Sequence, residues 1–280
     1  MAGKILVIGA TGNVGRPLVK ALLARGEAVK AASRTGKPVD GAEGVVFDVA
    51  DPMTFPKAFE DVDRAFVMLP SGYTEAKALL LPIIEAAATR GVKVVLQSVL
   101  GVDADDSIPY RQAEIALETS GVRWVVLRPN WFTDNFVNYW KPGIDAAGVI
   151  AVPAADGKTS FSAWRDIADS AAAALTTDRC DGKACNRTGP EALGYAESAA
   201  LISEAIGKPV VYQAVDDDSF VGILVGAGVP EVYARFLASI FHPVREGWTA
   251  VVTDDVRTLT GHPARQVAAW VKENAAVLKS

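Results

Sequence analysis

Cysteine and histidine are scarce in this sequence. Its 280 residues include two cysteines, Cys180 and Cys185, and two isolated histidines, His242 and His262. The cysteines lie in the segment DRCDGKAC, which has no second cysteine pair and no nearby histidine, so we expect no metal site. In a reducing compartment they are most simply free thiols on either side of a turn at Gly182.

Dense positive charge and long apolar runs are also missing. The 28 Lys and Arg residues are outnumbered by 33 Asp and Glu residues, which gives a net charge of −5, and no basic cluster interrupts the sequence. Nucleic acid and anionic membranes are therefore not expected partners. No apolar stretch is long enough to cross a bilayer, and the start MAGKILVIGATG lacks the pattern of a signal peptide. We expect a cytoplasmic protein, either a monomer or a homodimer.

The first 130 residues contain a regular alternation of β-rich runs and helical patterns. The expected strands are residues 4–8, 28–33, 44–48, 64–69, 92–98 and 123–129. The expected helices are residues 13–25, a short helix from Pro52, and residues 74–89 and 110–120. Such alternation predicts an α/β fold of the Rossmann type, with a doubly wound parallel sheet covered on both faces.

The pattern changes after Pro129. Five aromatic residues crowd into residues 131–140, and the later elements are mostly helical. We expect helices at 164–176, 195–206, 216–227, 230–242 and 263–278, and strands at 183–189 and 210–215. Residues 1–129 would form the cofactor-binding core, completed by 160–189. Residues 130–159 and 190–280 would form a smaller C-terminal lobe that binds the substrate.

The segment GATGNVG, residues 9–15, follows the first strand and opens the first helix. Glycines permit a sharp turn and a close approach of the backbone to a pyrophosphate, which the helix N-terminus would bind. A glycine pattern alone is weak, but between a strand and a helix it predicts a dinucleotide site. The alternative is an ordinary strand-to-helix turn. We expect the cofactor to contact Gly9, Thr11, Gly12, Asn13, Val14 and Gly15.

The end of the second strand indicates which dinucleotide is bound. An NAD site places Asp or Glu there for the ribose 2′-hydroxyl, whereas this sequence has Ser33 and Arg34, with Lys37 close behind. A cation suits the 2′-phosphate of NADP(H), although an arginine in that place can also be an ordinary solvated side chain. Asp48, at the end of the third strand, would reach the adenine or cap a helix ahead of Pro52.

Several segments together resemble the NmrA-like atypical short-chain dehydrogenase/reductases. They are GATGNVG, the Arg34 position, VLQSVLG (95–101), LRPNWFTDNF (127–136), and IGKPVVYQAV and GILVGAGVPE within 206–231. The resemblance covers nearly the whole chain and is strongest to NADPH-dependent quinone reductases and triphenylmethane dye reductases. It implies a Rossmann domain, a small substrate lobe and a cleft between them. Some members of this family are NADP(H)-binding regulators without activity, which is a second possibility here.

Two tyrosines bear on the chemistry. Typical members of the superfamily open the helix after the fifth strand with Tyr-x-x-x-Lys, but here Tyr110 is followed by Glu114. A carboxylate would raise the pKa of the phenol instead of lowering it, so we expect the usual dyad to be broken. Tyr73 and Lys77 have the right spacing in the wrong place, after the fourth strand, and we interpret that pair as chance.

Without a positioned acid, the sequence favours acceptors that need none. A quinone that accepts hydride becomes a stabilised hydroquinone anion, whereas a ketone becomes a strongly basic alkoxide. We expect Ser98 and Tyr110 to be the catalytic candidates, and Ser98 has an equal chance of being an ordinary strand-end hydroxyl. Further cofactor contacts are expected from Leu69, Pro70, Ser98 and Pro129. Substrate contacts are expected from Tyr73, Asn130, Trp131, Phe132 and Phe136, unless the aromatic cluster is simply core.

These observations predict an NADPH-dependent reductase that transfers hydride directly to a quinone-like or conjugated aromatic substrate. One alternative is a non-catalytic NADP(H)-sensing regulator. Another is a tailoring reductase that acts on one polycyclic pathway intermediate.

Overall fold

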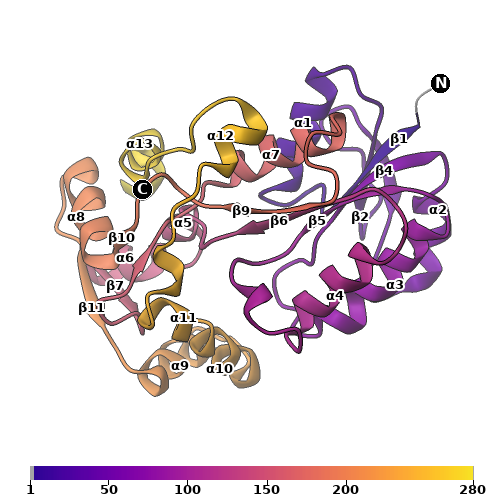
Figure 1. The fold of residues 1–280 in the computed structure, drawn as a ribbon. Helices are drawn as coiled ribbons and strands as arrows, with labels where there is room; N and C mark the ends of the chain where they lie inside the picture. Colours follow the sequence, from indigo (N-terminus) through magenta and orange to yellow (C-terminus); the bar gives the residue numbers. More distant parts are fainter. Residues whose placement is uncertain (1–2, 280) are drawn as a thin grey trace. The chain divides into compact units, whose positions relative to one another are not determined.

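The computed structural model describes residues 3–279, which divide into two compact units (Figure 1). The first unit comprises Met1–Pro129, Trp164–Arg187 and Asp255–His262. The second comprises Asn130–Ala163, Thr188–Asp254 and Pro263–Ser280. That the second unit binds the substrate stays a prediction.

The first unit is built on a seven-stranded sheet in which all pairings are parallel, with the order β3-β2-β1-β4-β5-β6-β9. The order reverses between β1 and β4, as in a doubly wound Rossmann sheet, so the predicted fold class is confirmed. The strands are β1 (Lys4–Ile8), β2 (Val29–Ser33), β3 (Glu43–Val46), β4 (Val62–Val67), β5 (Lys93–Gln97), β6 (Trp124–Pro129) and β9 (Lys183–Arg187).

Helices cover both faces of this sheet (Figure 1). One face packs against α2 (Phe55–Ala58), α3 (Ala76–Ala88) and α4 (Pro109–Glu118), and the other against α1 (Gly15–Ala24) and α7 (Trp164–Thr176). Three shorter helices also belong to this unit: the 3₁₀ turns Pro52–Thr54 and Val102–Ala104, and α12 (Asp255–Thr260). Because strand residues alternate between the two faces, continuous apolar runs such as KILVI are needed in the central strands, and Ile5 to Ile8 are buried.

The second unit combines short strands with helices around an aromatic core. Strand β7 (Val149–Val152) pairs in parallel with β11 (Val211–Ala214), and β8 (Lys158–Thr159) pairs antiparallel with β10 (Leu193–Gly194). The helices are α5 (Asn135–Asn138), α6 (Lys141–Ala147), α8 (Tyr195–Ile206), α9 (Asp217–Gly226), α10 (Glu231–Ser239), α11 (His242–Arg245), the 3₁₀ turn Trp248–Ala250, α13 (Val267–Glu273) and α14 (Ala275–Lys279).

Some expected elements of the second unit differ in the structure. The helix expected at 263–278 is two helices, α13 and α14, which meet at Asn274. The helix expected at 230–242 ends at Ser239, and Pro243 then occupies the first turn of α11, where a missing N–H costs nothing. The strand expected at 183–189 is β9 of the first unit, at the edge of the seven-stranded sheet.

Candidate functional site

The loop between β1 and α1 has the backbone geometry of a tight glycine turn. Gly9 has φ +74°, and the Gly12 amide donates to the Gly9 carbonyl at 2.9 Å. A Cβ on Gly15 would lie 2.1 Å from the Gly9 oxygen, so a side chain there would displace the start of the helix. Glycine is therefore required at both ends of this loop.

The N-terminus of α1 is open to an anion. No side chain caps the helix at Val14, and Thr11, Gly12 and Asn13 are exposed. The N-terminus of a ten-residue helix attracts negative charge, and the Arg16 amide at this end already donates to the Gly12 carbonyl. The loop therefore fits the pyrophosphate of a dinucleotide.

The turn after β2 presents Arg34 to solvent. The buried Ser33 accepts a hydrogen bond from the Gly36 amide at 3.2 Å, and Gly36 has φ +63°, which closes the turn. Arg34 and Lys37 are both exposed, and within residues 3–279 neither has an ion pair. The turn therefore places a cation at the carboxyl end of β2 whose charge no ion pair within residues 3–279 neutralises.

Asp48 follows β3 and is half-buried. Its Oδ1 accepts a hydrogen bond from the Ala50 amide at 3.0 Å, which is a local turn and not a helix cap. The cap of the following 3₁₀ turn is Asp51, whose side chain accepts from the Met53 amide. The helix-capping alternative for Asp48 is therefore wrong, and its contact with adenine stays a prediction.

Tyr73 lies in the segment after β4, whereas Lys77 lies in the helix that follows this segment. Leu69 is buried and Pro70 is half-buried. Tyr73 is partly buried and packs against the core on the sheet face that α2, α3 and α4 cover. Helix α3 begins at Ala76, so Tyr73 precedes the helix and does not share a helical face with the exposed Lys77. The interpretation of this pair as chance agrees with their placement.

Two neighbouring polar groups at the end of β5 lack partners. Ser98 is 2% exposed, and its hydroxyl has no hydrogen bond within the described part of the chain. The same holds for Oε1 of Gln97, a residue that the sequence did not single out. Unsatisfied buried polar groups are costly and uncommon, so each one needs an explanation, such as a catalytic role or a bound water, ion or ligand.

Helix α4 carries Tyr110 and a buried carboxylate. Tyr110 is half-buried against the core, and Glu114 is 0% exposed. Both oxygens of Glu114 accept hydrogen bonds from Arg128, at 2.9 Å from Nε and 2.6 Å from Nη2. Arg111 donates to the same carboxylate at 3.0 Å. Glu114 is thus fully occupied by two guanidinium groups.

The charges continue outward from this pair. Arg128 also donates to Asp103 at 2.5 Å, and Arg111 to Glu118 at 2.7 Å. Burial on its own lowers the pKa of Arg128, but its hydrogen bonds to Glu114 and the nearby carboxylates outweigh burial and leave that pKa raised. The network connects the end of β6, helix α4 and the turn after β5. Its signal in the sequence was Glu114 itself, in the place of the usual lysine.

The carboxyl ends of the seven parallel strands thus share one edge of the sheet. In parallel sheets of this kind ligands bind at that edge. The structure brings to it the residues of the first unit that were predicted to contact the cofactor: Gly9, Thr11, Gly12, Asn13, Val14 and Gly15 after β1, Ser33 at the end of β2 and Arg34 directly after it, Asp48 after β3, Leu69 and Pro70 after β4, Ser98 after β5, and Pro129 on β6.

The other predicted substrate residues belong to the second unit. The Asn130 amide donates to Ser160 at 2.8 Å and to the Thr249 carbonyl at 2.7 Å, and its oxygen accepts from the Trp131 amide. These contacts account for Asn130 as a structural residue. Its substrate contact stays an untested prediction.

The aromatic cluster of the second unit is mainly core. Phe136 is 0% exposed, with ring centroids 4.7 Å from Trp140 and 5.3 Å from Phe161. Trp131 is partly exposed and lies 4.5 Å from the ring of Phe241, and Phe132 is also partly exposed. Packing explains where Phe136 lies, whereas Trp131 and Phe132 retain surface that a ligand could contact.

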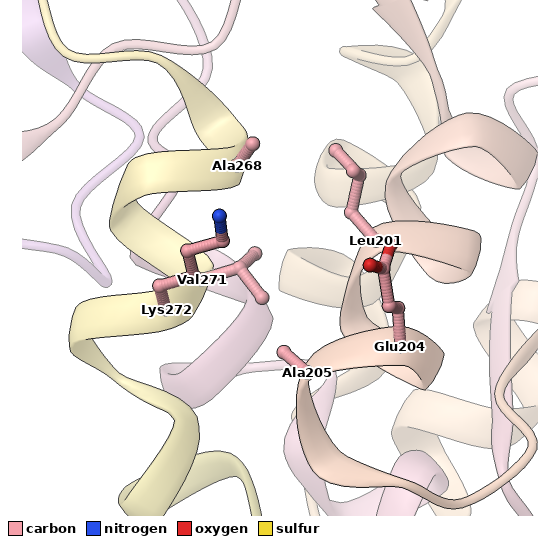
Figure 2. Close-up of a pocket in the computed structure, with 6 residues that line it drawn as sticks. All are labelled: Leu201, Glu204, Ala205, Ala268, Val271 and Lys272. Carbon is pink, nitrogen blue, oxygen red and sulfur yellow. The ribbon is translucent and has the colours of Figure 1, made fainter.

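A shallow pocket lies elsewhere in the second unit, between α8 and α13 (Figure 2). None of the predicted site residues contributes to it. Its lining is Leu201, Glu204, Ala205, Ala268, Val271 and Lys272. Among residues 3–279, no helix is long and apolar enough to span a membrane, and no group of three or more His, Cys, Asp or Glu side chains is arranged to hold a metal.

The model of a family described as NAD(P)H-binding matches residues 9–178. An NAD(P)H azoreductase of Xenophilus azovorans is 33% identical over 97% of this chain and 98% of that protein. Quinone oxidoreductase 2 of Escherichia coli is 26% identical over 94% of this chain and 96% of that protein.

A solved structure agrees with the fold. The triphenylmethane reductase of Citrobacter sp. is 26% identical and superposes with a TM-score of 0.83, over 98% of this chain and 99% of that one. The expected resemblance to quinone and dye reductases is confirmed by these relatives.

Proposed function

The chain belongs to the NAD(P)H-binding family, and from that premise we propose that it is an NADPH-dependent reductase of quinone-like or conjugated aromatic compounds, which accept hydride directly. Its relatives are named as an azoreductase, a quinone oxidoreductase and a triphenylmethane reductase. These names support an NAD(P)H-dependent oxidoreductase of the quinone, azo and dye reductase type. The preference for NADPH and the direct transfer are our proposals.

The cofactor has a matching set of residues in the first unit. The glycine turn and the uncapped start of α1 would hold the pyrophosphate. Arg34, which has no ion pair within residues 3–279, would hold the 2′-phosphate by charge-assisted hydrogen bonds. When bound, the dihydronicotinamide supplies a hydride.

The buried pair of Glu114 and Arg128 is the observation that carries the proposed chemistry. Glu114 occupies the position at which a lysine would assist Tyr110, and its carboxylate is paired with two arginines. No ammonium group therefore stands at this position to assist Tyr110. This supports a reaction that works without the Tyr-Lys dyad.

An acceptor that stabilises negative charge or loses positive charge suits such a site. Hydride brings two electrons and one proton to a quinone, and the resulting hydroquinone anion takes its second proton from water. A cationic dye is neutralised by the same hydride and needs no proton. The chain's task is then to orient the acceptor, for which Ser98 offers an unpartnered hydroxyl. Trp131 and Phe132 offer aromatic surface in the second unit.

An isotope experiment tests the direct transfer. NADPH carrying deuterium at both positions on C4 of the dihydropyridine ring is incubated with the protein and a triphenylmethane dye. We expect deuterium at the central carbon of the colourless product. Loss of the label to water would mean that the hydride does not pass directly, and binding of NADPH with no product from any acceptor would favour a regulator.

A further inference from the structure

The carboxamide of Gln97 is a polar group with no role in the fold. Its Oε1 is shielded from solvent, and within residues 3–279 it accepts no hydrogen bond. The adjacent Ser98 hydroxyl is in the same condition. A buried acceptor without a donor costs free energy, so the position is better explained by a ligand that supplies the missing donor.

The register of the sheet shows where Gln97 lies. Val7 of β1 pairs with Phe66 of β4, and Phe66 pairs with Val95 of β5. Residues two places further along share the same face, because side chains alternate along a strand. Gly9, Met68 and Gln97 are therefore neighbours in one row across the edge of the sheet. A Cβ on Gly9 would lie 3.1 Å from Sδ of Met68, which agrees with this row.

Gln97 and Ser98 face opposite sides of the sheet. Ser98 follows Leu96, which belongs to the core beneath α3 and α4 that Tyr110 also contacts. Gln97 follows Val95 and faces the side of α1 and its glycine turn. Two strand spacings separate Gln97 from Gly9, which is about 10 Å. Arg34 directly follows β2, which lies on the other side of β1 from β4 and β5.

This placement distinguishes the two halves of the cofactor. If the glycine turn holds the pyrophosphate and Arg34 the 2′-phosphate, the nicotinamide riboside extends toward β4 and β5. Phosphate oxygens only accept hydrogen bonds and cannot satisfy Oε1 of Gln97. The nicotinamide riboside carries donors of the required kind, the N–H groups of its carboxamide and its ribose hydroxyls.

We propose that Gln97 binds the nicotinamide riboside through a hydrogen bond to its side-chain oxygen, which makes it a cofactor-positioning residue. Its own carboxamide has one acceptor and one donor group, so it complements either the nicotinamide carboxamide or a ribose hydroxyl. Consecutive residues at the end of β5 then divide the work, with Gln97 toward the cofactor and Ser98 toward the substrate. The inference rests on the proposed function, because it requires NADPH in this site.

The test compares Gln97→Met with a matched control, Gln213→Met, by calorimetry. Methionine keeps the length of the side chain without its carbonyl, and Gln213 is an exposed strand residue of the second unit. For Gln97→Met we expect NADPH to bind about 5- to 50-fold more weakly, the loss of one hydrogen bond with a partner left unpaired. Binding of 2′,5′-ADP, which lacks the nicotinamide half, should not change. The melting temperature of the free protein should not fall, because the fold loses no hydrogen bond.

Two results would overturn the inference. One is NADPH affinity unchanged in Gln97→Met, and the other is an equal loss for NADPH and 2′,5′-ADP, which would indicate a general disturbance of the edge. If the unmodified protein does not bind NADPH at all, the proposed function fails instead.

An analogue identifies the donor. In 3-acetylpyridine adenine dinucleotide phosphate a methyl group replaces the amide nitrogen of the carboxamide. If the carboxamide is the partner of Gln97, the unmodified protein and Gln97→Met should bind this analogue equally. If the same ratio persists with the analogue, the partner is a ribose hydroxyl.

Discussion

Replacing Glu114 by glutamine tests whether the buried ion pair between Glu114 and Arg128 stabilises the fold. The change keeps the shape of the side chain and removes its charge. Arg128, 8% exposed at its side chain, would keep only Asp103, and Arg111 would lose one of its carboxylates. Removing one partner of a buried ion pair costs about 3–5 kcal/mol, because the remaining charge is left uncompensated.

The loss can be measured by urea unfolding with Glu118→Gln as the control. Glu118 lies on the same helix, binds Arg111 and is 27% exposed at its side chain, so its loss should cost about 0–1 kcal/mol. For Glu114→Gln the melting temperature should fall by about 6–20 °C, at roughly 2–4 °C per kcal/mol for a protein of this size class. If both variants unfold at the same urea concentration, the pair does not stabilise the fold as argued.

Glu114→Lys is a sharper version of the same test. The substitution creates the Tyr-x-x-x-Lys motif at Tyr110, but it also places a third cation beside Arg111 and Arg128. We expect a larger loss of stability than for glutamine and no reduction of simple ketones with NADPH. A stable variant that reduces ketones would show that the network does not control the chemistry of this helix.

Three further predictions follow from single side chains. Arg34→Asp should weaken NADPH binding about 10- to 150-fold, the loss of charge-assisted hydrogen bonds to phosphate, with little effect on NADH; equal losses would remove the 2′-phosphate role. Lys77→Ala should leave NADPH-dependent turnover near that of the unmodified protein, and a loss of several orders of magnitude would mean that the pair with Tyr73 is catalytic. Burial raises the pKa of Cys185 to about 11. An unfolded thiol ionises near pH ~8.5, so the contribution of this thiol to stability should be complete below that pH and decline as the pH rises toward 11. Rapid reaction of Cys185 with Ellman's reagent in the folded protein at neutral pH would contradict its burial.

The sheet could be predicted because its central strands are buried on both faces. A run such as KILVI has one interpretation when glycines and a helix follow it, and the residues of α7 and α8 were predicted to the position. The first unit has a boundary at Pro129, where the composition changes, but it also includes Asp255–His262, which the sequence assigned to the second lobe. Local patterns were sufficient for these strands and helices.

Features that depend on distant residues were not predictable. Strands β8 and β10 have two residues each and exist only because they pair with each other, with Thr159 opposite Leu193, 34 positions further along the sequence. The partner of Glu114 lies 14 residues away on another element, and Asp103 joins from a third. Gln97 was missed because its importance lies in a missing hydrogen bond, which no sequence pattern records.

The central claim is that this chain reduces quinone-like or conjugated aromatic acceptors with NADPH. The most direct measurement is the consumption of NADPH by the purified protein with a small panel of para- and ortho-quinones, an azo dye and a triphenylmethane dye, with NADH in parallel. We predict turnover of at least one acceptor class, faster with NADPH than with NADH. Tight binding of NADPH without turnover of any acceptor would contradict the claim.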